Sequence, residues 1–150
     1  MSESQLWDRV RKGLVEASDL KIDIHRVENM VGAGMPDVNF CYKGVEGWVE
    51  LKHADKPPAR DSTPVYHSGG LRPDQIVWIH KRARAGGRVF VLARCGESIF
   101  LVPGRFAKEF NDLTYPELID YSSWWTAKKR GVDWAGLLEV LCGDFVEVEV

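Results

Sequence analysis

The sequence predicts a single α/β domain in which helices flank a mixed β-sheet. Apolar residues recur at helical spacing in residues 2–17, and a second helical pattern begins at Pro73 and ends at Gly86-Gly87. Short extended runs complete the order helix, three strands, helix, strand. A chain of 150 residues can remove about two-thirds of its unfolded surface from water, which suits one domain. We expect the core to span residues 1–103, followed by a helical C-terminal extension over 104–150.

The first helix and strand follow from their apolar spacing. Residues 2–17 place Leu6, Trp7, Val10, Leu14 and Ala17 on one helical stripe. In the following run, 20–27, Ile22 and Ile24 alternate with polar residues, which is typical of a half-buried strand.

A hairpin is predicted over residues 38–52. Gly32, Gly34 and Pro36 indicate a tight turn that leads Asp37 into the run 38–42. Residues 43–47 then reverse the chain into the run 48–52. Because strand side chains alternate between faces, Glu50 and Lys52 share one face while the residues between them enter the core. One hairpin can therefore bring two carboxylates and an amine together.

This set of side chains suits phosphodiester hydrolysis. Carboxylate oxygens such as those of Asp37 and Glu50 are the ligands that Mg²⁺ or Mn²⁺ prefers. A cation such as Lys52 can orient an attacking water and offset the charge that develops on the phosphate. The hairpin therefore predicts a metal-dependent nuclease site.

The order of these parts resembles the PD-(D/E)xK nuclease superfamily, and most of all its VRR-NUC and phage Holliday-junction-resolvase-like branches. The matching parts are Pro36-Asp37, Glu50-Leu51-Lys52, the proline-started helix that carries Gln75, and the strand 88–94. The resemblance spans residues 3–95. It implies a restriction-endonuclease-like core of order αβββαβ and Mg²⁺-dependent endonucleolytic cleavage of DNA.

The resemblance also implies roles for individual residues. Asp37, Glu50 and the main-chain carbonyl of Leu51 would bind the metal, Lys52 would position the water, and Gln75 would support the site. Small nucleases of this kind often act as homodimers on branched DNA, because a twofold dimer presents two sites to a junction of matching symmetry. Junction DNA is the first expectation and duplex nicking the second.

The superfamily often places a further acid on its first helix, and three residues could supply it. At 100° per residue, Glu3 points in nearly the same direction as the apolar stripe, whereas Asp8 and Glu16 fall on the opposite, charged face. We therefore expect Glu3 to reach the site as a catalytic residue and metal ligand. The alternative is that Glu3 only complements the helix dipole in a fraying first turn.

Two alternatives to the nuclease interpretation stay open. Asp37 could cap a turn while Glu50 and Lys52 form an exposed ion pair of little energetic value. The fold could also be kept without catalysis, as a DNA-binding or protein-interaction module.

The long segment 53–70 leaves the predicted lysine and contains three prolines and a Gly-Gly pair. A segment of this length suits a substrate-facing flap, with Lys56, Arg60 and His67 as phosphate contacts, or a plain insertion. Arg72 follows as a further candidate DNA contact. In the next helix, Gln75 is either solvated or faces the site. Cations at the end of that helix, at 81, 82 and 84, complement the helix dipole or contact DNA.

The C-terminal half is expected to add a strand at 98–102, a short helix from Pro103, and a helix at 132–142. Trp124 and Trp125 precede Lys128, Lys129 and Arg130. This mixture favours a packed helix with a solvated edge over a platform that stacks on unpaired bases. Residues 144–150 alternate acidic and apolar residues, as an edge strand or dimer contact would.

Composition sets few further limits. The net charge is −2, which is unusual for a DNA-binding domain, but residues 61–95 carry six basic and two acidic residues. Three scattered cysteines suit a reducing compartment. With no membrane span or signal sequence in the pattern, we expect a cytoplasmic protein of a bacterium or phage-infected cell.

Overall fold

The computed structural model describes residues 2–27 and 32–143, and its framework is one six-stranded mixed sheet with strands in the order β1-β2-β3-β4-β5-β6. Only β3 and β4 are parallel neighbours; the other pairs are antiparallel. The strands are β1 (Asp23–Arg26), β2 (Val38–Tyr42), β3 (Val45–Ala54), β4 (Val89–Cys95), β5 (Ser98–Pro103) and β6 (Trp124–Thr126). The helices are α1 (Glu3–Ala17), α2 (Pro73–Arg84), α3 (Tyr115–Tyr121) and α4 (Trp134–Cys142), with the short 3₁₀ turns η1 (Gly104–Phe106) and η2 (Phe110–Asp112). The predicted core order, helix, three strands, helix, strand, is confirmed.

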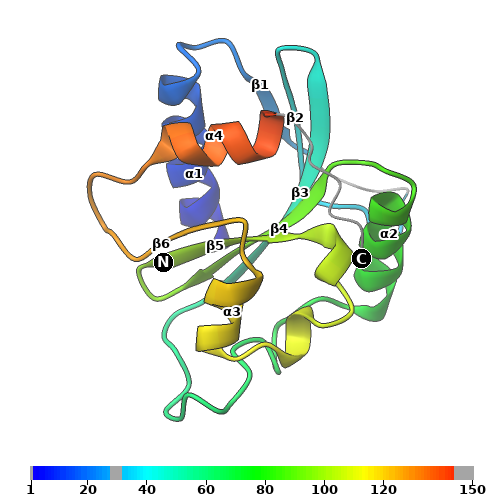
Figure 1. Cartoon of the computed structure of the whole chain (residues 1–150), viewed down its shortest axis with the longest axis vertical. Helices are drawn as coiled ribbons and strands as arrows, with labels where there is room; N and C mark the ends of the chain where they lie inside the picture. Colours follow the sequence, from blue (N-terminus) through cyan, green and yellow to red (C-terminus); the bar gives the residue numbers. More distant parts are fainter. Residues whose placement is uncertain (1, 28–31, 144–150) are drawn as a thin grey trace.

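Helices cover both faces of this sheet (Figure 1). On one face α1 and α4 pack against each other and against β3, around a cluster of buried aliphatic residues. On the other face α2, α3, η1 and η2 enclose a second cluster. The two clusters share β3, so its alternating side chains enter different environments on the two faces.

Helix α1 begins where the sequence provides a cap. The Ser2 hydroxyl accepts the amide of Gln5, and the Gln5 side chain accepts the amide of Ser2. Leu6, Val10 and Leu14 are buried as predicted. The following strand is shorter than the expected run 20–27, because Asp19 and Leu20 adopt positive φ and form a turn.

The hairpin turn is tighter than predicted. Lys43 and Gly44 have φ angles of 49° and 79°, so a two-residue turn connects the strands and β3 already begins at Val45. The prediction that 43–47 forms the turn is therefore wrong in length. The face assignment is confirmed, because Val49 and Leu51 join the cluster beneath α1.

The segment after β3 is less open than expected. Strand β3 continues to Ala54, and Val65 and Tyr66 are buried in the second cluster. The Tyr66 hydroxyl donates to the Arg94 carbonyl, and its ring stacks on Phe110 at 5.0 Å. The stretch 53–70 is therefore anchored at both ends.

The C-terminal extension contains helices, as predicted, but also completes the sheet. The helix expected at the tryptophan pair is wrong: Trp124–Thr126 forms β6, antiparallel to β5. Aromatic residues favour strands, and the unpaired edge of β5 supplies backbone partners. Trp124 stacks near Trp134 and Trp125 near Phe100, each at 6.3 Å between ring centroids. The strand expected at 144–150 lies outside the described residues.

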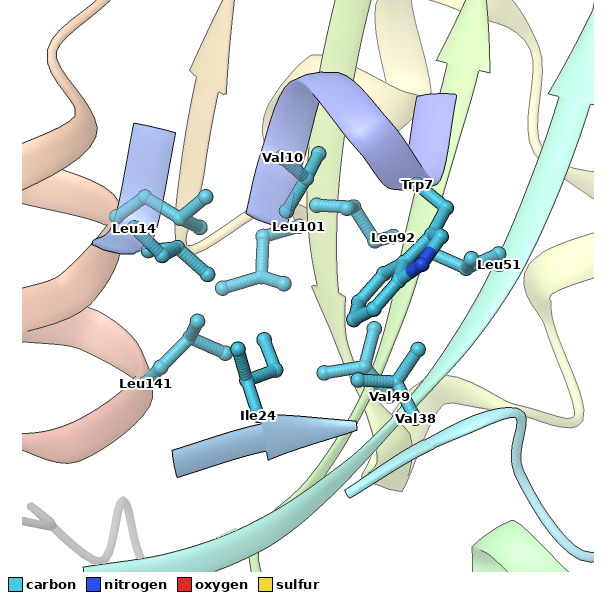
Figure 2. Close-up of a pocket in the computed structure, with 11 residues that line it drawn as sticks. Trp7, Val10, Leu14, Ile24, Val38, Val49, Leu51, Leu92, Leu101 and Leu141 are labelled. Atoms are coloured by element: carbon cyan, nitrogen blue, oxygen red, sulfur yellow. The ribbon is translucent and has the colours of Figure 1, made fainter. Parts of the chain in front are cut away.

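Side chains from α1, α4 and the sheet enclose a small apolar gap (Figure 2). Its volume is about 10 Å³, and Trp7, Leu51 and Leu141 are among its walls. A buried water needs a polar site with partners, so this gap is packing space beneath α1 and no ligand pocket. No helix of residues 2–27 and 32–143 is long and apolar enough to cross a membrane.

Candidate active site

Asp37 immediately precedes β2, which pairs with β3 in the antiparallel direction. Val38, the first residue of β2, is paired with Val49, so Asp37 lies beside Glu50, the residue that follows Val49. The Asp37 carboxylate accepts the amide of Leu51 at 3.3 Å, and its main-chain carbonyl accepts the amide of Val27 at 2.6 Å. These contacts fix the first acid at the mouth of the hairpin.

The turn that precedes Asp37 is fitted against the start of α2. Gly34 has φ of +81°, and a Cβ at this position would overlap the main-chain carbonyl of Asp74. A glycine is required here for both its backbone angle and its size. Pro36 is buried. The turn therefore brings Asp37 and the first turn of α2 to the same place.

Glu50 is the buried centre of the site, with a relative exposure of 2%. Its Oε1 accepts the side-chain amide of Gln75 at 3.1 Å and lies 4.0 Å from the Lys52 Nζ. With both acids ionised, its Oε2 has no hydrogen-bond donor among the described residues. A buried carboxylate oxygen without a partner is costly, so a positive ligand at this position would stabilise the site.

The pKa of Glu50 also shows that its ionised form is poorly stabilised in this site. Burial raises the pKa of its carboxyl to about 9, and a hydrogen bond with Asp37 and the negative charges of Asp37 and Glu3 act in the same direction. Lys52 acts against these effects but does not overcome them. Without a metal ion, a proton on Glu50 allows it to hydrogen-bond with Asp37. A divalent cation between the two carboxylates would replace that proton.

Gln75 connects the acid to α2. Its Oε1 accepts the backbone amide of Arg72, which caps the helix start, while its Nε2 donates to Glu50. Both ends of the amide are thereby used, and the side chain is buried at 5% exposure. The solvated alternative for Gln75 is wrong, because α2 packs across the sheet and turns this residue inward.

Glu3 lies at the edge of the site. Its carboxylate is 3.2 Å from the Arg26 guanidinium, and its charge contributes to the raised pKa of Glu50. Asp8 and Glu16 are exposed on the outer face of α1. The outward direction predicted for Asp8 and Glu16 agrees with the structure. Glu3 is partly exposed in its ion pair with Arg26, and its role as a catalytic residue and metal ligand stays a prediction.

The predicted DNA contacts lie outside this centre. Lys56, Arg60 and His67 are exposed along the segment before α2. Arg72 already forms an ion pair, because its guanidinium is 3.2 Å from the Asp74 carboxylate. The sequence did not predict that Gly34 lies against Asp74, although the glycine-rich turn indicated an unusual backbone conformation.

The donor set fits a hard divalent cation. The carboxylates of Asp37 and Glu50 offer oxygen, the ligand type that Mg²⁺ and Mn²⁺ take. Within residues 2–27 and 32–143, no group of three or more His, Cys, Asp or Glu side chains is placed to hold a metal. Two carboxylates agree better with Mg²⁺, which keeps several waters, than with a structural zinc site. The Leu51 carbonyl as a further ligand stays a prediction.

Comparison with known proteins supports the fold. No protein-family profile and no curated protein sequence matches this chain. Among solved structures, the chain is similar to Hjc of Archaeoglobus fulgidus, a Holliday junction resolvase from an archaeal hyperthermophile, with a TM-score of 0.51 and 16% sequence identity. The match covers 75% of this chain and 89% of Hjc. The restriction-endonuclease-like α/β fold is thus supported by structure as well as by sequence order.

Proposed function

We propose that this protein is a divalent-metal-dependent DNA endonuclease that hydrolyses phosphodiester bonds in branched DNA. The observation that carries the proposal is the buried Glu50 carboxylate, which faces Asp37 and has one oxygen without a donor in the described part of the chain. Buried carboxylate oxygens normally have a partner. A cation between Glu50 and Asp37 would supply the partner that this oxygen lacks when both carboxylates are ionised.

The side chains have distinct tasks in hydrolysis. Bound Mg²⁺ or Mn²⁺ would supply Lewis acidity to the phosphate and lower the pKa of a water molecule. The Leu51 amide fixes Asp37, and Gln75 fixes Glu50, so that the two carboxylates keep their separation. Lys52, with 14% of its side chain exposed, would orient the attacking water and offset charge that develops on the phosphate.

Branched DNA is the substrate that the fold supports best. Hjc, which shares the architecture, is a Holliday junction resolvase. A homodimer would give two sites to a junction of matching symmetry. This assembly is part of the proposal.

The test is a cleavage panel with the purified protein. Four-way junction, flap, single-stranded and linear duplex DNA would be incubated with Mg²⁺, with Ca²⁺ and with a chelator. We expect Mg²⁺-dependent cleavage, fastest on the junction, and binding with slowed cleavage in Ca²⁺. Equal cleavage of all four DNAs would overturn the substrate choice. Tight DNA binding without cleavage under any divalent metal would favour the non-catalytic module.

A second test asks whether Glu3 belongs to the active site. Because Glu3 is close enough to influence Glu50, whereas Asp8 is exposed on the outer face of α1, Glu3→Gln is expected to lower the rate at saturating Mg²⁺ by about tenfold or more. Asp8→Asn and Glu16→Gln should leave it unchanged. Identical rates for all three variants would remove Glu3 from the site.

A further inference from the structure

A groove on the outer side of α2 carries three lysine and arginine side chains and lies apart from the proposed metal site. Its volume is about 520 Å³, and its walls include His80, Lys81 and Arg84 from α2 and Lys108 from the segment between η1 and η2. None of the residues that line it is acidic. A concave surface with one sign of charge attracts the opposite charge.

These cations differ from the other cations around α2. Arg72 is paired with Asp74, and Arg82 and Arg105 lie over aromatic rings at 4.7 Å. Lys81, Arg84 and Lys108, in contrast, are exposed and have no ion pair or side-chain hydrogen bond with any residue of 2–27 or 32–143. Within the described part of the chain, nothing neutralises these three charges.

The helix dipole does not explain the whole groove. Cations in the last turn of α2 complement the negative end of that helix. Lys108 belongs to a different segment, yet it lines the same groove. The cations of this groove therefore come from two segments of the chain.

The position of the groove identifies which part of a substrate it could hold. Arg84 follows Gln75 by nine residues, which at 100° per residue places it on the opposite side of α2, about 13.5 Å along the axis. Gln75 contacts Glu50. An anion in the groove therefore lies away from the scissile phosphate by at least about four base steps of 3.4 Å, because the displacement across the helix adds to the rise along its axis.

We propose that the α2 groove binds the phosphodiester backbone of a DNA arm that flanks the cleavage point. This inference rests on the proposed function, since it assumes that the substrate is DNA. Lys81, Arg84 and Lys108 would contact successive phosphates, and Val77, which is 66% exposed, would offer sugar carbons an apolar contact. Such contacts position a duplex without reading its sequence.

The experiment measures DNA binding over a range of salt concentrations, with Ca²⁺ in place of Mg²⁺. The groove variant is K81Q/R84Q/K108Q. The control variant is R11Q/K12Q/K21Q, which removes the same charge from exposed positions on α1 and the turn after it. Fluorescence anisotropy with a labelled junction and a labelled duplex gives the affinities, and thermal unfolding verifies that both variants are folded.

We expect the groove variant to bind both DNAs at least about tenfold more weakly near 0.1 M salt. The slope of log affinity against log salt should fall by about two to three, because each lost phosphate contact removes roughly 0.9. The control should retain the slope of the unmodified protein. Equal slopes for the two variants would overturn the inference.

The outcome also separates this inference from the nuclease proposal. If the unmodified protein binds DNA through the groove but cleaves nothing, the groove inference stands and the catalytic proposal fails. If the protein cleaves DNA but the groove variant binds DNA as the control variant does, the catalytic proposal stands and the groove inference fails. Absence of salt-dependent DNA binding would overturn the groove inference.

Discussion

Glu50 combines the features that define the site at the scale of a single residue. It is buried, its pKa is raised by burial and by Asp37, and Gln75 and Lys52 approach the same oxygen. Alternation along the strand predicted that Glu50 and Lys52 share a face. It could not predict that Glu50 is buried, because the cover comes from α2, which is more than twenty residues away in sequence.

Replacement of the ionisable Glu50 carboxyl by an amide is expected to stabilise the metal-free protein. The folded pKa of about 9 exceeds the ordinary value of 4.5, so the folded state holds the proton more tightly. Stability from this group is complete below pH 4.5 and is lost as the pH rises through 9. We expect Glu50→Gln to raise the free energy of unfolding by about 1–3 kcal/mol at pH 7 in a chelator, and by little at pH 4.5.

Denaturation from pH 4.5 to 9 measures this effect. Glu46→Gln is the control, because Glu46 is on the same strand but exposed. If the stability of Glu50→Gln changed with pH as that of the unmodified protein does, the claim that Glu50 is buried and binds a proton would be contradicted.

At the scale of elements, the close approach between the Asp37 turn and α2 holds the site together. Gly34→Ala is expected to cost more than about 2 kcal/mol, because the new methyl overlaps the Asp74 carbonyl and the backbone angle is left-handed. Gly44→Ala is the matched change: its φ is +79°, but no atom lies within 4 Å of the added Cβ. It should cost about 1 kcal/mol. Equal losses in urea unfolding would show that the approach is unimportant.

Elements with a local signal were predictable, and elements that depend on a neighbour were not. Proline at the start and glycines at the end defined α2 closely, and a capped apolar stripe defined α1. The tryptophan pair had no decisive periodicity, and its strand forms because β5 offers an edge. Likewise Lys108 enters the α2 groove only through the packing of η1 on α2.

At the scale of the whole molecule, the C-terminal extension is part of the core. Leu137, Leu138 and Leu141 of α4 are buried in the cluster with Leu6 and Leu14 of α1. We predict that a chain ending after residue 112 loses cooperative unfolding, since several buried leucines, each worth roughly 2 kcal/mol or more, are removed together. Calorimetry of the shortened chain tests this; a cooperative transition near that of the full chain would contradict it.

Dimerisation stays a prediction. Trp124 packs within the subunit against Trp134, whereas Trp125 is 43% exposed at the edge strand. The general architecture was predictable from the order of elements, but the sixth strand and this exposed edge were not.

The central claim is that Asp37, Glu50 and Lys52 form a metal-dependent hydrolytic site. Its most direct test is the single-turnover rate of junction cleavage at saturating Mg²⁺ for the unmodified protein and for folded Glu50→Gln, Lys52→Ala and Glu46→Gln variants. The first two variants should be slower by a factor of about 100 or more, equivalent to roughly 2.7 kcal/mol of transition-state stabilisation, while Glu46→Gln should retain the full rate. A folded Glu50→Gln or Lys52→Ala protein that cleaves at the unmodified rate would contradict the claim.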